Sequence, residues 1–311
     1  MELVDVHIAD PSSPYSYVAF PLREEKDGRK VTKHAGSVWT GVEFVIELSY
    51  DISQEIVIEG QKLDLVHECA AALWAWETFG GIGARTRRGF GALQLIERDG
   101  EQATLPNCNA IERQIRSNLE TYVSSDNWPD GIPHLDTDVQ LVVTKRFGSS
   151  DEAWMHLFSQ LKKFRQARYP NRRQLPYGRS KWPEPDEIRR LTHIYDPKHA
   201  PRHPVRKFPR ARFGLPILFQ FKDQGDPPTM TLKPRDSERF ASRLILRPIE
   251  CANGSVGLAL VLKGPEDPPG SYVLENSRSF DVQVNLSQEE ADKTEPLNGN
   301  PDVLQAFLDT L

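Results

Sequence analysis

Residues 76–97 are WETFGGIGARTRRGFGALQLIE, and this stretch sets the frame of the first part of the chain. Five glycines and three arginines fall within the twelve positions 80–91, between a helix-like and a strand-like segment. Glycine supplies backbone conformations with positive φ, and arginine supplies a planar cation that can grip an oxyanion through paired hydrogen bonds. The stretch therefore predicts a tight turn that carries positive charge.

Regular patterns lie on both sides of this turn. Residues 63–79 carry apolar side chains three and four positions apart, which predicts an amphipathic helix that ends at Gly80 and Gly81. Residues 42–50, VEFVIELSY, alternate apolar and polar side chains, and residues 91–97 have a similar composition, so both are predicted strands. The first part of the chain is expected to run strand, helix, glycine-rich turn, strand.

The later part mixes helices and strands without the regular rhythm of a parallel sheet. Helices are predicted at 110–123, at 150–168 with Ser150 as the cap, at 186–194 and at 300–311, and strands at 138–147, 214–221, 242–250 and 256–264. We therefore expect an α+β fold with antiparallel sheets. A polar stretch at 99–109 marks the boundary between the two expected units, 1–105 and 106–311.

The composition is that of a globular chain with an uneven distribution of charge. The 311 residues, 38% hydrophobic and 27% charged, are enough for two domains and argue against disorder. The formal net charge is −5, yet residues 165–212 hold 14 Lys or Arg against four Asp or Glu, and residues 264–311 hold two against ten. One face is therefore expected to meet a polyanion while another is only solvated.

The spacing of cysteines and the hydropathy of the sequence indicate in which cellular compartment the protein is expected. Cys69, Cys108 and Cys251 lie far apart without paired spacing, which predicts neither a disulfide framework nor a zinc site and is typical of a reducing compartment. The chain has no run of 18 apolar residues, and its first residues lack the pattern of a signal peptide. We expect a cytoplasmic protein that does not associate with a membrane.

Known phosphate-binding loops can be compared with residues 80–91. The dinucleotide-binding fingerprint would require glycine at Thr86 and a strand before the turn, and no register fits the Walker loop. The remaining interpretation is a loop whose bare backbone and cations let a polynucleotide approach; the alternative is a surface turn that is only incidentally basic. The residues expected to contact the polynucleotide are Gly80, Gly81, Gly83, Arg85, Arg87, Arg88, Gly89 and Gly91.

Residues 165–212 form a second candidate, because arginines there are interleaved with Tyr169, Tyr177 and Trp182. Single-stranded RNA is bound by such mixtures, in which cations follow the phosphates and flat side chains stack on bases. Alternatively, Trp182 fills a hydrophobic gap and the helical arginines pair with nearby acids. The residues expected to contact RNA are Arg172, Arg173, Arg179, Lys181, Trp182, Arg189, Arg190, Arg206, Lys207, Arg210 and Arg212.

Catalytic and metal-binding patterns are weak. His199 and His203 are four apart, but Pro201 lies between them and we expect no acidic or cysteine ligand close by. His67 stands about three helical turns, ~20 Å, before the loop, too far to act there as a general base. His134 and His193 stay open as candidates. No metal or cofactor is expected.

The stretch FGGIGARTRRGFGAL (79–93) resembles the glycine-rich loop of the RAMP superfamily, the RNA-binding subunits of CRISPR effector complexes. Residues 179–192, 213–221 and 241–249 sharpen the resemblance to the first RAMP subunit of the type III-B (Cmr) effector, and most of residues 15–263 are covered. The resemblance implies two ferredoxin-like (RRM-like) domains. The first, 1–105, would be incomplete at its N-terminus, and the second, 106–311, would carry a basic insertion at about 165–213.

The resemblance also implies a function. The expected protein is a non-catalytic subunit for antiviral defence that binds the 3′ region of guide RNA, or the guide–target RNA duplex, and docks other RAMP subunits. A metal-independent endoribonuclease that processes guide precursors, and a scaffold without RNA contact, are the alternatives. The family begins with a TPLFTGG-like segment and an arginine-rich helix, which this sequence lacks. Either the chain is truncated or a separate polypeptide completes the first domain, whose sheet would otherwise keep an unpaired edge.

Overall fold

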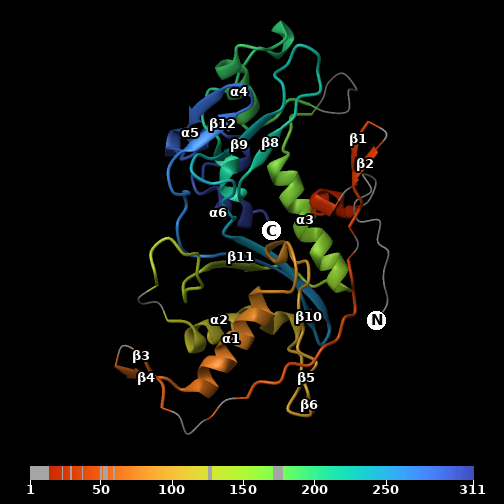
Figure 1. The fold of residues 1–311 in the computed structure, drawn as a ribbon, viewed down its shortest axis with the longest axis vertical. Helices are drawn as coiled ribbons and strands as arrows, with labels where there is room; N and C mark the ends of the chain where they lie inside the picture. The colour runs from red at the N-terminus through yellow and green to blue at the C-terminus, as the bar shows by residue number, and fades with distance from the viewer. Residues whose placement is uncertain are drawn as a thin grey trace.

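A central three-stranded antiparallel sheet organises the protein. The computed structural model describes residues 14–22, 24–28, 30–36, 38–49, 51, 55–58, 60–124, 128–170 and 178–311. The sheet consists of β7 (Gln140–Val143), β10 (Leu244–Cys251) and β11 (Gly254–Val261) in the order β10-β11-β7. The long hairpin of β10 and β11 crosses the middle of the molecule (Figure 1).

Helices cover both faces of this sheet. Helix α3 (Ser150–Arg165) packs on one face, where Leu244 and Leu246 of β10 join its core. Helices α1 (Leu65–Phe79) and α2 (Ile111–Tyr122) lie on the other face, where Ile245 is buried (Figure 1). Successive strand residues point to opposite faces, so the apolar run Leu244–Leu246 of β10 supplies side chains to the cores on both sides of the sheet.

The connection through α3 gives this part its topology. The chain runs from β7 through α3 to β10 and then back along β11, which lies between the other two strands. Strands β7 and β10 are thus parallel to each other, and these four elements have the order of the first four of the six in a ferredoxin-like unit. The N-cap of α3 is Ser149 and not Ser150, because the extended Ser149 accepts a hydrogen bond from the Glu152 amide at 3.2 Å.

A second antiparallel sheet lies beyond the C-terminal end of α3 (Figure 1). It contains β8 (Ile217–Phe219), β9 (Met230–Pro234), β12 (Tyr272–Glu275) and β13 (Ser279–Val282) in the order β13-β12-β9-β8. Helix α4 (Glu184–Thr192) contributes Ile188 to the same core as Phe208, Leu232 and Leu274. The C-terminal helices α5 (Gln288–Asp292) and α6 (Val303–Leu308) add to the core beside α3.

The remaining elements are short. Three isolated hairpins pair β1 (Glu25–Asp27) with β2 (Lys30–Lys33), β3 (Val57–Ile58) with β4 (Gln61–Lys62), and β5 (Glu97–Arg98) with β6 (Glu101–Gln102). Single turns of 3₁₀ helix are η1 (Pro14–Tyr17), η2 (Phe20–Leu22), η3 (Thr86–Arg88), η4 (Cys108–Ala110), η5 (Pro197–His199), η6 (Pro209–Phe213) and η7 (Glu295–Leu297).

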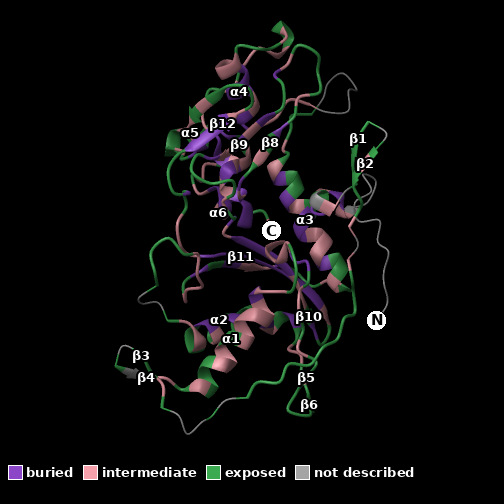
Figure 2. Cartoon of the chain, in the orientation of Figure 1, coloured by how far each residue is buried: buried purple, intermediate pink, exposed green. Residues whose placement is uncertain are grey.

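The expected α+β class with antiparallel sheets is confirmed in the described part of the chain, and two complete ferredoxin-like domains stay a prediction. Two predicted strands were wrong. Residues 42–49 are extended but join no sheet, and of 91–97 only Glu97 lies in a strand. Figure 2 shows the extended segment as exposed, whereas β10 and β11 are buried. No described helix is both long and apolar enough to span a membrane.

Candidate nucleic-acid interface

The glycine-rich turn is a closed loop between α1 and the segment that leads to β5. The amide of Ile82 donates to the Gly91 carbonyl oxygen at 3.0 Å, which joins the two ends of the loop. Between them, Arg85 adopts a left-handed conformation with φ 64° and precedes η3, and Gly89 leaves η3 with φ 75°. The predicted location of the turn is therefore confirmed, and its backbone does use positive φ.

Most of the glycines are required by packing inside the protein. A Cβ atom at Gly81 would lie 2.8 Å from the carbonyl oxygen of Gly91, and one at Gly89 would lie 2.5 Å from Nε1 of Trp154. Gly80 meets the Trp76 carbonyl oxygen at 2.6 Å in the same way, and Gly91 meets Ile82. Only exposed Gly83, with φ 88°, has open space at its missing Cβ. The loop thus offers one open glycine and not five.

Two arginines fix the loop to the start of β10, to Ser242 just before it and to the end of η6. The Arg88 guanidinium donates to the carbonyl oxygens of Leu244 at 2.6 Å and Phe213 at 3.3 Å, and Arg87 donates to that of Ser242 at 2.5 Å. Indole Nε1 of Trp154 on α3 donates to the Arg88 carbonyl oxygen at 2.9 Å. All these acceptors are neutral, so the arginines are held in place while their positive charges are not neutralised.

Arg165, in the last turn of α3, brings a fourth charge to the loop. Burial lowers the pKa of Arg88 to about 9, and the positive charges of Arg165, Arg85 and Arg87 add to this decrease. Burial also lowers the pKa of Arg85, again with Arg165 contributing. We call Arg85, Arg87, Arg88 and Arg165 the guanidinium cluster. Within the described residues, no carboxylate forms an ion pair with any of the four.

The guanidinium cluster has donors to spare. The Nε atoms of Arg85 and Arg165 are buried and have no hydrogen-bond partner among the described residues. Buried or half-buried charges are normally paired, because removing a charged group from water costs free energy unless another group binds it. Several converging guanidinium groups without a counter-charge are therefore a site for an anion, and a phosphate offers the oxygen geometry that arginine forks match.

The part of the basic segment that follows α3, residues 168–212, is different, because carboxylates pair with most of its described arginines. We call these residues the basic middle segment. Asp186, 4% exposed, accepts from Arg179 at 2.6 Å and Arg189 at 3.3 Å, and from the amides of Arg202 and His203 at 2.8 Å. Burial alone would raise the pKa of Asp186, but these hydrogen bonds outweigh it and lower the pKa below its ordinary value. The aspartate is thus a structural anchor.

The other expected RNA contacts in this segment are mostly engaged as well. Ion pairs link Arg189 to Asp226 at 2.6 Å, Arg190 to Glu187 at 3.0 Å, Arg210 to Glu184 at 3.1 Å, Lys181 to Glu295 at 2.6 Å and Arg212 to Asp267 at 3.1 Å. Lys207 donates to the Gln283 side chain at 2.6 Å, and Arg206 is exposed. Arg172, Arg173 and Tyr177 lie outside the described residues.

The position of Trp182 shows that the prediction of its stacking on RNA bases was wrong. Its side chain is only 1% exposed, lies 5.4 Å from the Phe164 ring centroid, and donates through Nε1 to the Phe164 carbonyl oxygen at 2.8 Å. A side chain in this position cannot stack on a base, and the alternative, that Trp182 fills a hydrophobic gap, describes it. Core packing thus accounts for Trp182, whereas Tyr169 is 40% exposed.

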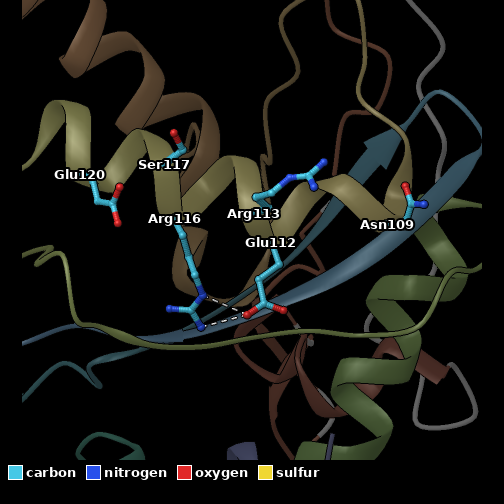
Figure 3. Close-up of a pocket in the computed structure, with 6 residues that line it drawn as sticks. All are labelled: Asn109, Glu112, Arg113, Arg116, Ser117 and Glu120. Carbon is cyan, nitrogen blue, oxygen red and sulfur yellow. Dashed lines mark hydrogen bonds and ion pairs between the residues drawn. The ribbon is translucent and has the colours of Figure 1, made fainter.

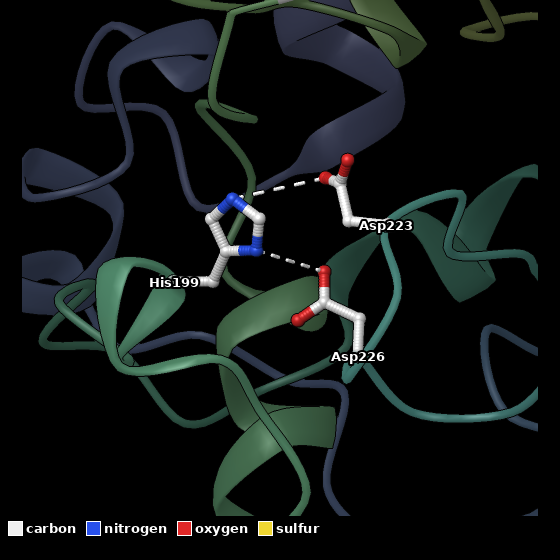
Figure 4. A group of neighbouring side chains, drawn as sticks. All are labelled: His199, Asp223 and Asp226. Carbon is white, nitrogen blue, oxygen red and sulfur yellow. Dashed lines mark ion pairs between the residues drawn. The ribbon is translucent and has the colours of Figure 1, made fainter.

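His199 has acidic neighbours that the sequence did not reveal. Its Nδ1 lies 3.4 Å from Asp226 Oδ2 and its Nε2 lies 3.7 Å from Asp223 Oδ2 (Figure 4). The expectation of no acidic residue nearby was therefore wrong, because folding brings the turn at 223–226 beside η5. Asp226 already accepts two hydrogen bonds from Arg189. One ligand atom from each of His199, Asp223 and Asp226 lies within 4.8 Å of the others, and the buried Nδ1 of His199 has no hydrogen-bond partner among the described residues.

The structure describes the other three histidines considered as catalytic candidates. His67 is in the first turn of α1, at the opposite end of that helix from the loop, and stacks against Tyr122 at 5.4 Å. His134 stacks on Trp128 with a centroid distance of 4.8 Å. His193 ends α4 in a left-handed conformation with φ 57°.

A polar hollow on the outer face of α2 also contains arginines. It is lined by Asn109, Glu112, Arg113, Arg116, Ser117 and Glu120 (Figure 3). Arg116 donates through Nε and Nη2 to Glu112 at 3.0 and 2.9 Å, so its charge is compensated. This surface provides a useful control for the guanidinium cluster, because its arginines are exposed, helical and distant in sequence.

One comparison with known proteins gives a match that includes the glycine-rich turn. No curated protein and no solved structure matches the chain. The family model of the RAMP superfamily, whose proteins are generally CRISPR-associated and bind RNA, matches residues 2–94. The matched part contains α1, η3 and the first three arginines of the guanidinium cluster. Over these residues, the chain is similar to the RAMP superfamily.

Proposed function

We propose that this protein is a non-catalytic RNA-binding subunit of a type III-B CRISPR effector complex, and that the guanidinium cluster holds the guide RNA by its backbone. The observation that carries the proposal is the absence of a carboxylate partner for this cluster within the described residues. The loop lies in the part of the chain that resembles the RAMP superfamily. The anion that would balance the charge of the guanidinium cluster is therefore RNA phosphate.

The geometry favours contact with phosphates over contact with bases. Two aromatic rings that pack at the loop are occupied, since Phe90 is 6% exposed and Trp154 packs edge-to-face on Phe90 and Phe158 at 5.0 Å. Arginine contacts to phosphates position a nucleic acid without reading its sequence. Sequence recognition would then be left to pairing between guide RNA and target RNA, and docking to other RAMP subunits would use further surfaces.

The proposal is tested by RNA affinity. The variant R85Q/R165Q removes two charges of the cluster that make no hydrogen bond to the β10 backbone, and R113Q/R116Q on α2 is the matched control. We expect R85Q/R165Q to bind fluorescently labelled single-stranded RNA about tenfold to a hundredfold more weakly, equally for several unrelated sequences. The α2 control should bind like the unaltered protein. Equal affinity of all three proteins would contradict the proposed site.

A nuclease assay tests the non-catalytic part of the proposal. The purified protein is incubated with guide precursor RNA in the presence of EDTA, and the products are separated by size. We expect intact precursor at every time point. Cleavage at one defined position, abolished by changing His134 or His193 to alanine, would replace the proposal by the metal-independent endoribonuclease.

A further inference from the structure

Residues 42–49 form an extended segment beside α1 that no described strand accompanies. They make no backbone–backbone hydrogen bond with any residue that the structure describes. Their apolar side chains stay in solvent, with Val45 95%, Leu48 51% and Phe44 48% exposed. Side chains of this size and order are typical of a half-buried strand. The segment therefore has the composition of a strand but belongs to no described sheet.

The segment has two distinct faces. Phe44 lies toward α1, with its ring centroid 6.3 Å from that of Trp76, so the face formed by residues 42, 44, 46 and 48 is directed at the helix. The opposite face carries Glu43, Val45 and Glu47. Neither glutamate forms an ion pair with a described residue. A strand laid beside this segment would extend the apolar face over α1 and meet acidic side chains on the other face.

A second extended run passes the same turn of α1. The Leu95 amide donates to the Glu77 side chain at 2.8 Å, one residue after Trp76, and residues 92–96 belong to no strand. This second run is partly bonded, since Ile96 accepts from the Ala103 amide at 2.8 Å and Leu93 accepts from Arg247 at 2.9 Å. Residues 42–49, without a described strand beside them, present a row of backbone donors and acceptors, which is the template for adding a strand from outside.

We propose that residues 42–49 are a docking edge for an extended segment of a second polypeptide whose side chains alternate between apolar and basic. The apolar side chains of the partner would cover α1 beside Phe44, and its lysines or arginines would lie opposite Glu43 and Glu47. Directly opposed charges of unlike sign stabilise neighbouring strands, whereas like charges destabilise them. The partner is therefore a protein of complementary charge, and this interface is separate from the guanidinium cluster.

Charge excludes a second copy of this segment as the partner. In an antiparallel pair that keeps the apolar faces together around Val45, Glu43 of each copy stands opposite Glu47 of the other. In a parallel pair in register, each glutamate lies beside its own counterpart. Both arrangements bring like charges together on the face away from α1, which opposes self-association.

The test uses the full chain and two synthetic nine-residue peptides, one alternating lysine with valine and one alternating glutamate with valine. We expect the lysine peptide to bind and to slow hydrogen exchange at the amides of 42–49, and the glutamate peptide to do neither. The variant E43K/E47K should bind the lysine peptide at least about tenfold more weakly and should gain binding to the glutamate peptide. The variant E120K/E238K, which alters two exposed glutamates elsewhere, should behave like the unaltered protein.

Three results would overturn the inference. The first is lysine-peptide binding that E120K/E238K weakens as much as E43K/E47K does, because attraction to overall negative charge would then suffice. The second is binding without protection at 42–49. The third is protection of these amides in the unaltered protein before any peptide is added, because a second copy or another part of this chain would then already occupy the edge.

Discussion

Two arginine-rich regions of this protein look alike in sequence and differ in structure. In the basic middle segment, buried carboxylates such as Asp186 and Glu184 hold the guanidinium groups, so the positive charge belongs to the fold. In the guanidinium cluster the acceptors are backbone carbonyls, and no described carboxylate balances the charge. A run of arginines therefore indicates a polyanion site only where the fold does not also supply the acids.

The largest expected effect comes from removing an acid of the basic middle segment. The change Asp186→Ala leaves Arg179 and Arg189 without their shared carboxylate and removes the acceptor of two amides. Breaking a buried ion pair by removing one partner costs about 3–5 kcal/mol of unfolding free energy. Chemical denaturation monitored by circular dichroism measures this loss. A loss below about 1 kcal/mol would mean that these arginines are not structural.

The loop should respond to a methyl group at Gly89. The change Gly89→Ala strains a backbone with φ 75° and places a carbon against Trp154. Strain and overpacking together are expected to cost about 2–4 kcal/mol of unfolding free energy. Gly83→Ala is the matched control, because its open surroundings leave only the backbone strain of about 1 kcal/mol. Equal losses in the two variants would show that the loop does not pack on α3 in this way.

The stability of the protein at low pH should depend on Asp186, a carboxylate of the basic middle segment that has no counterpart in the guanidinium cluster. Its pKa is lower in the folded protein than in the unfolded chain, so its contribution to stability is complete above the unfolded value, about 3.9, and is lost as the pH falls through the folded value. We expect the unaltered protein to lose stability more steeply than Asp186→Asn as the pH is lowered below about 4. Parallel curves of denaturation midpoint against pH would contradict this assignment.

A small anion should stabilise the guanidinium cluster and leave the basic middle segment unaffected. Ligands that bind only the folded state raise the melting temperature by mass action. We expect tripolyphosphate, compared with chloride at equal ionic strength, to raise the melting temperature by about 2–4 °C in the unaltered protein and in R113Q/R116Q. In R85Q/R165Q the increase should disappear. An unchanged increase in R85Q/R165Q would place the anion elsewhere.

Local patterns predicted the elements that tertiary contacts support. The alanine-rich helix, the apolar runs of β10 and β11 and the position of the glycine-rich turn all follow from periodicity and turn chemistry. Residues 42–49 have an equally clear strand pattern, but a strand also needs a neighbour, and alternation of side chains cannot supply one. Among the described residues, no strand pairs with this segment.

The candidate site was predicted only in part, for a related reason. The sequence places Arg85, Arg87 and Arg88 in one turn but does not show that Arg165 joins them from α3. It also does not show that Asp226 meets Arg189, 37 positions earlier. Charge compensation depends on pairs that are distant in sequence, so composition could locate the positive charge and could not tell which part of it is neutralised.

The salt dependence of RNA binding tests the central claim most directly. Each phosphate that a cation neutralises adds to the slope of log affinity against log salt concentration, by about 0.7 for single strands. We predict that the slope becomes shallower by about 1.4 in R85Q/R165Q and is unchanged in R113Q/R116Q. A slope in R85Q/R165Q equal to that of the unaltered protein would show that the guanidinium cluster does not hold the RNA backbone.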